Sequence, residues 1–334
     1  MTISGRSGRD TILVTGGAGF IGSNIAAALA DDGWRVVVSD WFGTGAKWKN
    51  LAPTLLDDIL RPEDVRDWLG AHHRRVEAIV HMGAISATTE ADVDLIVARN
   101  IRTTLDLFAF CAERDIRFVY ASSAATYGGG EHGFVDDQSP EHLARLRPLN
   151  AYGWSKLIVD RRIVDDAGAG RPLPPQWAGL KFFNVYGPNE THKDDMRSVI
   201  NKVFPIAASG ETVTLFKSHI PDYADGGQLR DFVHVADCVG VVRWLLASPS
   251  VNGLFNVGTG KARSFADLAS AVFRALGKEP AIRYVDMPEK LQGSYQYFTE
   301  ADLSKLRGAG YNADFLSLED GVARYVAHLA AGGV

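Results

Sequence analysis

Between residues 11 and 188, short apolar runs alternate with longer segments whose apolar residues recur at helical spacing. Strands are predicted at residues 12–15, 36–40, 78–81, 118–122 and 180–184. Helical periodicity marks residues 21–31 and 100–114 in particular. Strands that alternate with helices form parallel sheets with right-handed crossovers and helices on both faces. The pattern therefore predicts an α/β fold built on a doubly wound parallel sheet.

The alternation becomes less regular after Pro188. Polar residues dominate 218–229, and residues 282–297 mix strand-forming side chains with charges and aromatic rings. We expect these parts to form a smaller, interleaved C-terminal α/β lobe over the carboxyl ends of the strands. The larger predicted domain comprises residues 11–188 and a return segment at about 233–262. The smaller lobe comprises residues 189–232 and 263–330, and residues 1–10 are predicted to be a flexible extension.

Composition narrows the class of protein. The chain has 334 residues, of which 46% are apolar and 22% are charged, as in ordinary globular proteins with a large core. A net charge of −5 gives no basic surface for a nucleic acid. No apolar run approaches the roughly 20 residues that span a bilayer, so no membrane partner is expected. Cys111 and Cys238 lie far apart without metal-ligand spacing, which favours reduced thiols in a cytoplasmic protein and no metal site.

A glycine motif follows the first predicted strand and opens the first predicted helix. Gly16, Gly19 and Gly22 have the spacing G-x-x-G-x-x-G. Gly16 permits a tight turn, Gly19 permits close approach of a pyrophosphate, and Gly22 permits close packing of helix and strand. The N–H groups at the helix N-terminus favour the negative charge. The context predicts a Rossmann-type dinucleotide-binding domain rather than a glycine-rich turn without a ligand.

Asp40 ends the second predicted strand, about 20 residues beyond the glycines, where a carboxylate binds the adenosine ribose. Alone it favours NAD, because a carboxylate repels the 2′-phosphate of NADP. Lys47 and Lys49 follow in the same loop and could neutralise that phosphate, or could simply be solvated. The sequence leaves both cofactors open. We expect the cofactor also to pass over backbone that follows a later strand, at Met82, Gly83 and Ala84. His81, just before them, is interpreted as a packed residue.

Candidate proton-transfer chemistry lies further along the chain. A tyrosine is a poor base at neutral pH, because its ordinary pKa is near 10. Lys156 lies on the same helix face as Tyr152, and its ammonium together with a positive nicotinamide ring would lower that pKa. Tyr152 could then take an alcohol proton while hydride leaves. Ser123 stands just past a strand end and could form a hydrogen bond with the reacting oxygen. Alternatively, it is a small residue that serves only packing. Because neighbouring side chains of a strand point to opposite faces, Ser123 is preferred over Ser122.

Several sequence blocks carry a family resemblance. Residues 122–128, 148–156 and 183–190 resemble the extended short-chain dehydrogenase/reductase family of nucleotide-sugar enzymes. His192-Lys193, with the blocks at 230–233 and 295–299, resembles the ADP-glyceromanno-heptose 6-epimerases within that family. The resemblance covers nearly the whole chain.

The resemblance implies an isomerase that inverts C6 of ADP-D-glycero-D-manno-heptose. A tightly held NADP takes hydride from C6, the 6-keto sugar reorients, and hydride returns to the opposite face. Two faces need two proton-handling groups, which by position are Tyr152 and Lys193. A lysine base needs a lowered pKa, which partial burial could supply. The resemblance also implies a homo-oligomer, described as a pentamer, and a role in lipopolysaccharide core biosynthesis.

The resemblance assigns further positions residue by residue. It places the cofactor at Phe20, Ile21, Asp40, Trp41, Lys47, Asn100, Tyr152, Lys156 and Val185. It places the substrate at Ser123, Asn184, Asp195, Lys202, Leu215, Phe216, Arg230 and Tyr295. Arg230 suits a diphosphate as a planar fork of donors, with an ion pair to Asp231 or another carboxylate as the alternative role.

The chain also departs from the family pattern. Asp194-Asp195 replaces Gly-Ser, Lys202 replaces a histidine, and Trp41 replaces an asparagine. These changes keep open an epimerase for another nucleotide sugar, such as a UDP-hexose at C4. Ala124-Ala125 stands where a dehydratase has its acid and base, which disfavours dehydration. A non-catalytic dinucleotide-binding protein is the remote alternative. Such a protein could dispense with Tyr152 and Lys156, whereas this chain retains both.

Overall fold

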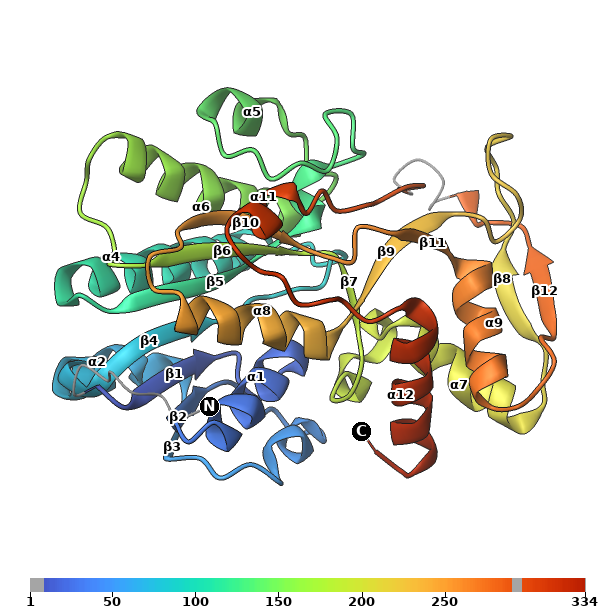
Figure 1. The fold of residues 1–334 in the computed structure, drawn as a ribbon, viewed down its shortest axis with the longest axis horizontal. Helices are drawn as coiled ribbons and strands as arrows, with labels where there is room; N and C mark the ends of the chain where they lie inside the picture. The colour runs from blue at the N-terminus through green and yellow to red at the C-terminus, as the bar shows by residue number, and fades with distance from the viewer. Residues whose placement is uncertain (1–8, 290–295, 334) are drawn as a thin grey trace.

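The central feature of the fold is a seven-stranded sheet with the order β10-β6-β5-β4-β1-β2-β3, in which every pairing is parallel (Figure 1). The computed structural model describes residues 9–289 and 296–333. The strands of this sheet are β1 (Thr11–Thr15), β2 (Arg35–Ser39), β3 (Asp58–Leu60), β4 (Val76–His81), β5 (Arg117–Ser123), β6 (Trp177–Phe182) and β10 (Gly253–Val257). The Rossmann-type fold that the sequence predicts is therefore confirmed.

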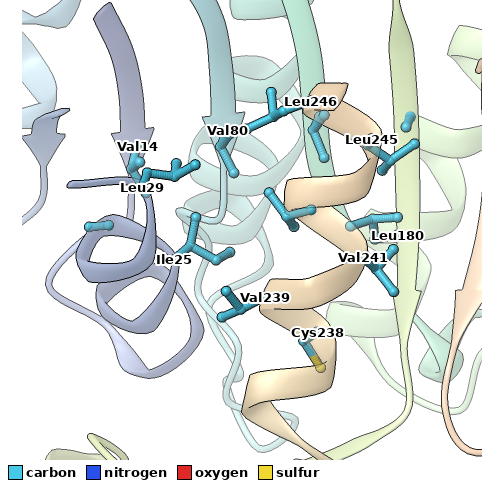
Figure 2. Close-up of a cluster of buried hydrophobic side chains, with 14 of the residues drawn as sticks. Val14, Ile25, Leu29, Val80, Leu180, Cys238, Val239, Val241, Leu245 and Leu246 are labelled. Atoms are coloured by element: carbon cyan, nitrogen blue, oxygen red, sulfur yellow. The ribbon is translucent and has the colours of Figure 1, made fainter. Parts of the chain in front are cut away.

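Alternate residues of each strand contribute to two apolar layers. Ile12 and Val14 of β1 pack with one layer, and Leu13 between them packs with the other. Helices α1 (Phe20–Asp31) and α8 (Val235–Ala247) cover the first face. Figure 2 shows Val239 and Leu245 of α8 beside α1 and the strands. A segment far along the chain thus returns to complete this layer.

Three longer helices cover the other face of the sheet. They are α2 (Val65–His72), α4 (Thr103–Arg114) and α6 (Ala151–Gly168). The shorter helices α3 (Val93–Ile96) and α5 (Pro140–Arg145) lie in the connections before α4 and α6. The helix predicted at 100–114 begins earlier and changes form, because residues 97–102 make wider π-type turns before α4.

A smaller α/β lobe lies to one side of the large sheet (Figure 1). It contains the strands β7 (Asn184–Tyr186), β8 (Val213–Phe216), β9 (Leu229–His234), β11 (Ala262–Ser264) and β12 (Ile282–Val285). Its helices are α7 (Val199–Ser209), α9 (Phe265–Ala275) and α12 (Leu318–Ala330), and α11 (Ser304–Gly308) lies against the large sheet. Strand β9 pairs with β7 and β11, and β8 pairs with β12.

The strand predicted at residues 180–184 is two strands. The first, β6, ends at Phe182 in the large sheet, and β7 begins at Asn184 in the three-stranded sheet. Between them Phe183 donates its N–H to the Val257 carbonyl over 3.0 Å. One strand-like segment therefore changes sheets, which apolar periodicity cannot reveal.

Two remaining expectations concern the N-terminus and membranes. Of the predicted extension, residues 1–8 lie outside the described residues, while Asp10 donates its N–H to the Arg75 carbonyl over 3.1 Å. Across the described ranges, no helix combines the length and the apolar character needed to cross a bilayer.

Candidate functional site

A cleft of about 580 Å³ opens at the carboxyl ends of β1, β2, β4 and β5. It lies where the strand order reverses between β1 and β4, which is the usual ligand position in doubly wound sheets. It is lined by most of the predicted site residues: Gly16, Gly19, Phe20, Ile21, Gly22, Asp40, Trp41, Lys47, Met82, Gly83, Ala84, Ser123, Tyr152, Lys156, Val185 and Lys193. Folding thus brings both lobes to one cleft.

The glycine loop is built so tightly that side chains would not fit. Gly16 has a φ of +64°, and a Cβ there would lie 2.6 Å from Gly83 Cα. A Cβ at Gly22 would lie 2.2 Å from the Gly16 carbonyl oxygen. Gly19 caps α1 without a side chain, and the first turn of α1 contains no acidic residue. The exposed end of α1 therefore suits an anionic group such as a pyrophosphate.

The carboxylate of Asp40 is already partnered within the protein. Ala18 donates its N–H to Asp40 Oδ2 over 2.9 Å, and Lys47 Nζ lies 2.5 Å from Asp40 Oδ1. Lys47 also donates to the Trp41 carbonyl over 3.1 Å. Because the ammonium neutralises the carboxylate, the repulsion that favours NAD over NADP in the sequence argument is weakened.

An aromatic and charged wall continues the cleft beyond Asp40. The Arg99 guanidinium carbon lies 4.2 Å from the centroid of the Trp41 ring, a cation–π contact. Trp41 Nε1 donates to Glu63 over 3.1 Å, and Arg99 lies 3.9 Å from the same carboxylate. The sequence analysis missed Arg99 and Glu63, because nothing in their local sequence marks them.

Tyr152 stands in the first turn of α6. Asn150 caps this helix by accepting the Gly153 N–H over 2.8 Å, which aims the turn at the cleft. The Tyr152 phenol forms a hydrogen bond with Ser123. Burial raises the pKa of Tyr152, and the Ser123 bond acts in the opposite direction. Lys156 is not among the causes of this shift, so the lowering of the Tyr152 pKa that the sequence predicts from its ammonium is not found in the protein alone.

Lys156 is buried one turn further along α6, with Nζ 5.9 Å from the centroid of the Tyr152 ring. Burial lowers the pKa of Lys156 to about 8, while the nearby Asp160 carboxylate raises it. Ser122 donates its hydroxyl to Asp160 over 2.7 Å, away from Tyr152. Ser123 is thus the hydroxyl that serves the cleft.

Lys193 also lines the cleft. It lies in the 3₁₀ segment Thr191–Met196, and its Nζ is 5.4 Å from the centroid of the Phe20 ring. The side chain is half-buried; burial lowers the pKa of Lys193, and Glu190 raises it. An amine with a lowered pKa can exist in its neutral, proton-accepting form nearer to neutral pH.

Residues 12–258 match the NAD dependent epimerase/dehydratase family. The chain belongs to this family. Among similar proteins of the family are the ADP-L-glycero-D-manno-heptose-6-epimerases of Nitratidesulfovibrio vulgaris (strain DP4) and Fusobacterium nucleatum. The first is 50% identical over 317 residues, covering 94% of this chain and 96% of the relative. The second is 45% identical over 329 residues, covering 96% and 98%.

Solved structures of epimerases share the fold over its whole length. Helicobacter pylori ADP-L-glycero-D-manno-heptose-6-epimerase has a TM-score of 0.79 at 28% identity, covering 98% of this chain and 99% of that one. Thermus thermophilus UDP-glucose 4-epimerase, solved in complex with NAD, has a TM-score of 0.73 at 25% identity, covering 96% and 99%. The likeness to epimerases therefore includes the smaller lobe.

The cleft of this epimerase/dehydratase family member fits a dinucleotide. The glycine loop accepts no side chain, the N-terminus of α1 faces the cleft, and Lys156 stands beside Tyr152. Asn100 is buried behind the cleft wall instead of lining it: its amide donates to the Ile85 carbonyl over 3.0 Å and accepts the Ile85 N–H over 2.8 Å. Asn100 thus fixes backbone that does line the cleft.

The predicted substrate residues lie mostly outside this cleft. Asn184 is exposed on β7, Leu215 is buried in the core of the smaller lobe, and Phe216 follows it half-buried. Lys202 and Asp195 are both exposed, and Lys202 Nζ donates to the Asp195 carbonyl over 2.7 Å. Asp195 and Lys202 therefore contact each other at the surface and do not line the cleft. Tyr295 lies outside the described residues.

Arg230 of β9 is buried and faces backbone carbonyls. It donates to Leu229 over 2.8 Å and to the Gln296 carbonyl, and its guanidinium carbon is 5.7 Å from the centroid of the Phe265 ring. Asp231 instead accepts N–H groups from another loop, including that of Thr259 over 2.7 Å. Arg230 and Asp231 therefore bond to different loops in these contacts.

His81 has the packed role that the sequence suggests. Its ring nitrogens contact Thr15 Oγ1 at 2.6 Å and Thr104 Oγ1 at 2.9 Å. Burial, with a smaller effect from Lys156, lowers the pKa of His81 to about 3. The imidazole is therefore neutral and joins β4 to α4. Other cleft residues that carried no sequence signal are Arg66, Thr103, Asp106 and Phe110.

Proposed function

We propose that this chain is an ADP-L-glycero-D-manno-heptose-6-epimerase, which interconverts the two C6 epimers of ADP-glycero-D-manno-heptose. The observation that carries the proposal is that Tyr152 and Lys193, from different lobes, line one cleft with the glycine loop. Relatives with this name are up to 50% identical over 94% of the chain. Two proton-handling groups suit inversion of a carbinol, because hydrogen leaves one face and returns to the other.

A nicotinamide bound in the cleft supplies reversible hydride transfer, so no net oxidation occurs. Tyr152 accepts the C6 hydroxyl proton on one face, and Ser123 steadies the reacting oxygen by a hydrogen bond. Lys156 holds positive charge beside Tyr152 and is placed to bind the nicotinamide ribose. The carbonyl sugar turns over, and Lys193 handles the proton on the second face.

We propose NADP as the cofactor. Lys47 cancels the Asp40 charge, and Arg99, whose charge faces the Glu63 carboxylate over 3.9 Å, lines the same end of the cleft. A 2′-phosphate is therefore tolerated electrostatically where an isolated carboxylate would repel it. The nucleotide released on denaturing purified protein tests this directly: NADP supports the assignment, and NAD alone contradicts it.

The activity is tested by incubating purified protein with ADP-D-glycero-D-manno-heptose without added cofactor. We expect the L-glycero epimer to accumulate until the two epimers reach equilibrium, as followed by proton NMR. UDP-glucose is the comparison substrate, which tests the alternative of a C4 epimerase. Conversion of UDP-glucose to UDP-galactose without conversion of ADP-heptose would replace the proposal by a C4 epimerase. Tight cofactor binding without turnover of either sugar would indicate a non-catalytic protein.

Two further proposals concern the setting of the enzyme. Cys111 and Cys238 are both buried and unpaired, which suits a reducing compartment such as the cytoplasm. The homo-oligomer, a pentamer by family resemblance, stays a prediction that sedimentation of the purified protein would test.

A further inference from the structure

Three asparagine side chains join the glycine loop and the start of α1 to residues 187–198, the turn that carries Lys193. We propose that Asn24, Asn50 and Asn189 form an amide clamp that positions Lys193 relative to the bound cofactor. The inference rests on the proposed function, in which Lys193 is the second proton-handling group. The three asparagines are positioning residues, since they act through the backbone and through Lys193.

Asn50 is the centre of the clamp. It is 4% exposed and lies in the 3₁₀ segment Lys47–Leu51. Its Nδ2 is 2.9 Å from the Ala18 carbonyl in the glycine loop. The same nitrogen is 3.2 Å from the Asn189 carbonyl and 3.1 Å from His192 Nδ1. One buried amide therefore touches both the cofactor loop and the residue that precedes Lys193.

Asn24 and Asn189 repeat this connection in both directions. Asn24, from α1, donates to the Phe20 carbonyl and to the Pro188 carbonyl, each over 2.9 Å. Asn189 donates in return to Ser23 Oγ over 3.0 Å. Asn189 also has a φ of +74°, a left-handed conformation that asparagine tolerates better than most residues. The turn is thus tied to the N-terminal half of α1 from both sides.

Hydrogen bonds also connect the two ends of the turn that is held in this way. Glu190 is fully buried and accepts the N–H and the hydroxyl of Ser198, each over 2.5 Å. Lys193 donates its own N–H to the Glu190 carbonyl over 3.0 Å. Since these bonds link Lys193 to residues 189–190, contacts of the asparagines with that edge should influence where the Lys193 amine lies relative to Phe20.

If Asn50 positions Lys193, its substitution should affect the two epimers unequally, which substitution of a merely structural residue would not do. Lys193 serves one face of C6, so misplacing it should slow oxidation of one ADP-heptose epimer more than of the other. The readout is reduction of the bound nicotinamide after each epimer is added separately to the holoenzyme. We expect Asn50→Ala to slow the same epimer as Lys193→Met does, by about tenfold or more relative to the other epimer.

A second readout is independent of activity. Hydrogen–deuterium exchange of the segment 187–198 reports local opening of the turn. Loss of the Asn50 bonds should speed exchange there by about tenfold in both the apo and the holo protein. Asn24→Ala, which removes only the Pro188 link to the turn, should give a smaller effect of the same kind and serves if Asn50→Ala does not fold.

Asn256→Ala is the matched control. Asn256 is equally buried, and its Nδ2 donates to the Phe134 and Asp302 carbonyls over 2.8 and 3.0 Å, in a different part of the protein. It should lower stability without epimer selectivity and without faster exchange at 187–198. Equal slowing of both epimers by Asn50→Ala, or unchanged exchange at 187–198, would overturn the clamp. If Lys193→Met itself lacks epimer selectivity, the proposed base role fails, and exchange alone then decides the clamp.

Discussion

Tyr152 differs from phenylalanine by the one oxygen that the proposed proton transfer uses. Tyr152→Phe should therefore reduce turnover by roughly two to four orders of magnitude, the usual contribution of a general acid–base group. Binding of the nucleotide sugar should persist, because the ring remains. Steady-state kinetics and calorimetric titration with ADP-heptose measure the two effects. Turnover near that of the unmodified enzyme would remove Tyr152 from the mechanism.

Lys193 should be as sensitive as Tyr152, and its effect should depend on pH. The lysine amine accepts a proton only in its neutral form, and burial lowers its pKa. Oxidation of the epimer whose C6 hydroxyl faces Lys193, measured as reduction of the bound nicotinamide, should therefore become faster as pH increases through that pKa. Lys193→Met should lower turnover by roughly two to four orders of magnitude and abolish this limb of the pH profile. Intact turnover in Lys193→Met would favour an epimerase that uses Tyr152 alone.

His81 gives the protein a specific sensitivity to acid. Its pKa is about 3 in the folded protein against an ordinary 6.5, so the unfolded chain binds a proton first as pH falls. The free energy of unfolding therefore decreases from about pH 6.5 toward pH 3. When pH falls from about 7.5 to about 5, the free energy of unfolding should decrease by about 2 kcal/mol less in His81→Gln than in the unmodified protein.

Urea unfolding at both pH values measures this difference for His81. Parallel pH dependence of the two proteins would contradict the prediction, because it would show that His81 has the same pKa in the folded protein as in the unfolded chain. Any constant difference in stability between the two proteins would then reflect packing alone.

At the scale of elements, one buried ion pair joins β5, α6 and β6 behind the cleft. Lys181 Nζ of β6 lies 2.6 Å from Asp160 Oδ2 of α6, and both side chains are fully buried. Tyr120 and Ser122 of β5 donate to the same carboxylate over 2.9 and 2.7 Å. This network holds the strand that ends in Ser123 against the helix of Tyr152.

Lys181→Met should therefore cost about 3–5 kcal/mol of stability, because it leaves a buried carboxylate without its cation. Arg162→Met is the control on the same helix: Arg162 pairs with Asp166 over 3.2 Å at the surface and should matter little. Urea unfolding compares the two. Similar small losses in both variants would mean that Asp160 is protonated once Lys181 is gone.

Across the whole molecule, the cleft joins two lobes that fold around different cores. Glycine-loop residues come from the large sheet and Lys193 from the smaller lobe, so a dinucleotide contacts both. Adding NADP back to nucleotide-free protein should raise the melting midpoint. A free ligand concentration of about 100 times the dissociation constant stabilises the folded state by about 2.7 kcal/mol. NAD at the same concentration should stabilise less. Equal shifts with both nucleotides would contradict selection of the 2′-phosphate.

Local sequence was most informative where one segment performs one task. The glycine loop, the strand ends and the Tyr152–Lys156 turn each lie within a few residues, so periodicity and spacing predicted them. The strand at 180–184 was predicted as one, because apolar periodicity does not say which sheet a strand joins. Arg99 and Glu63 were missed because their roles depend on the distant Trp41.

The sequence by itself determined the doubly wound fold and the residue types for nicotinamide chemistry. Both follow from apolar periodicity, from the spacing of the glycines and from the spacing of Tyr152 and Lys156. Only the tertiary structure decided that Lys47 neutralises Asp40 and that Asn50 joins the glycine loop to the turn of Lys193. The physical reason is that charge compensation and hydrogen bonding depend on distances of a few ångströms, which chain separation does not specify.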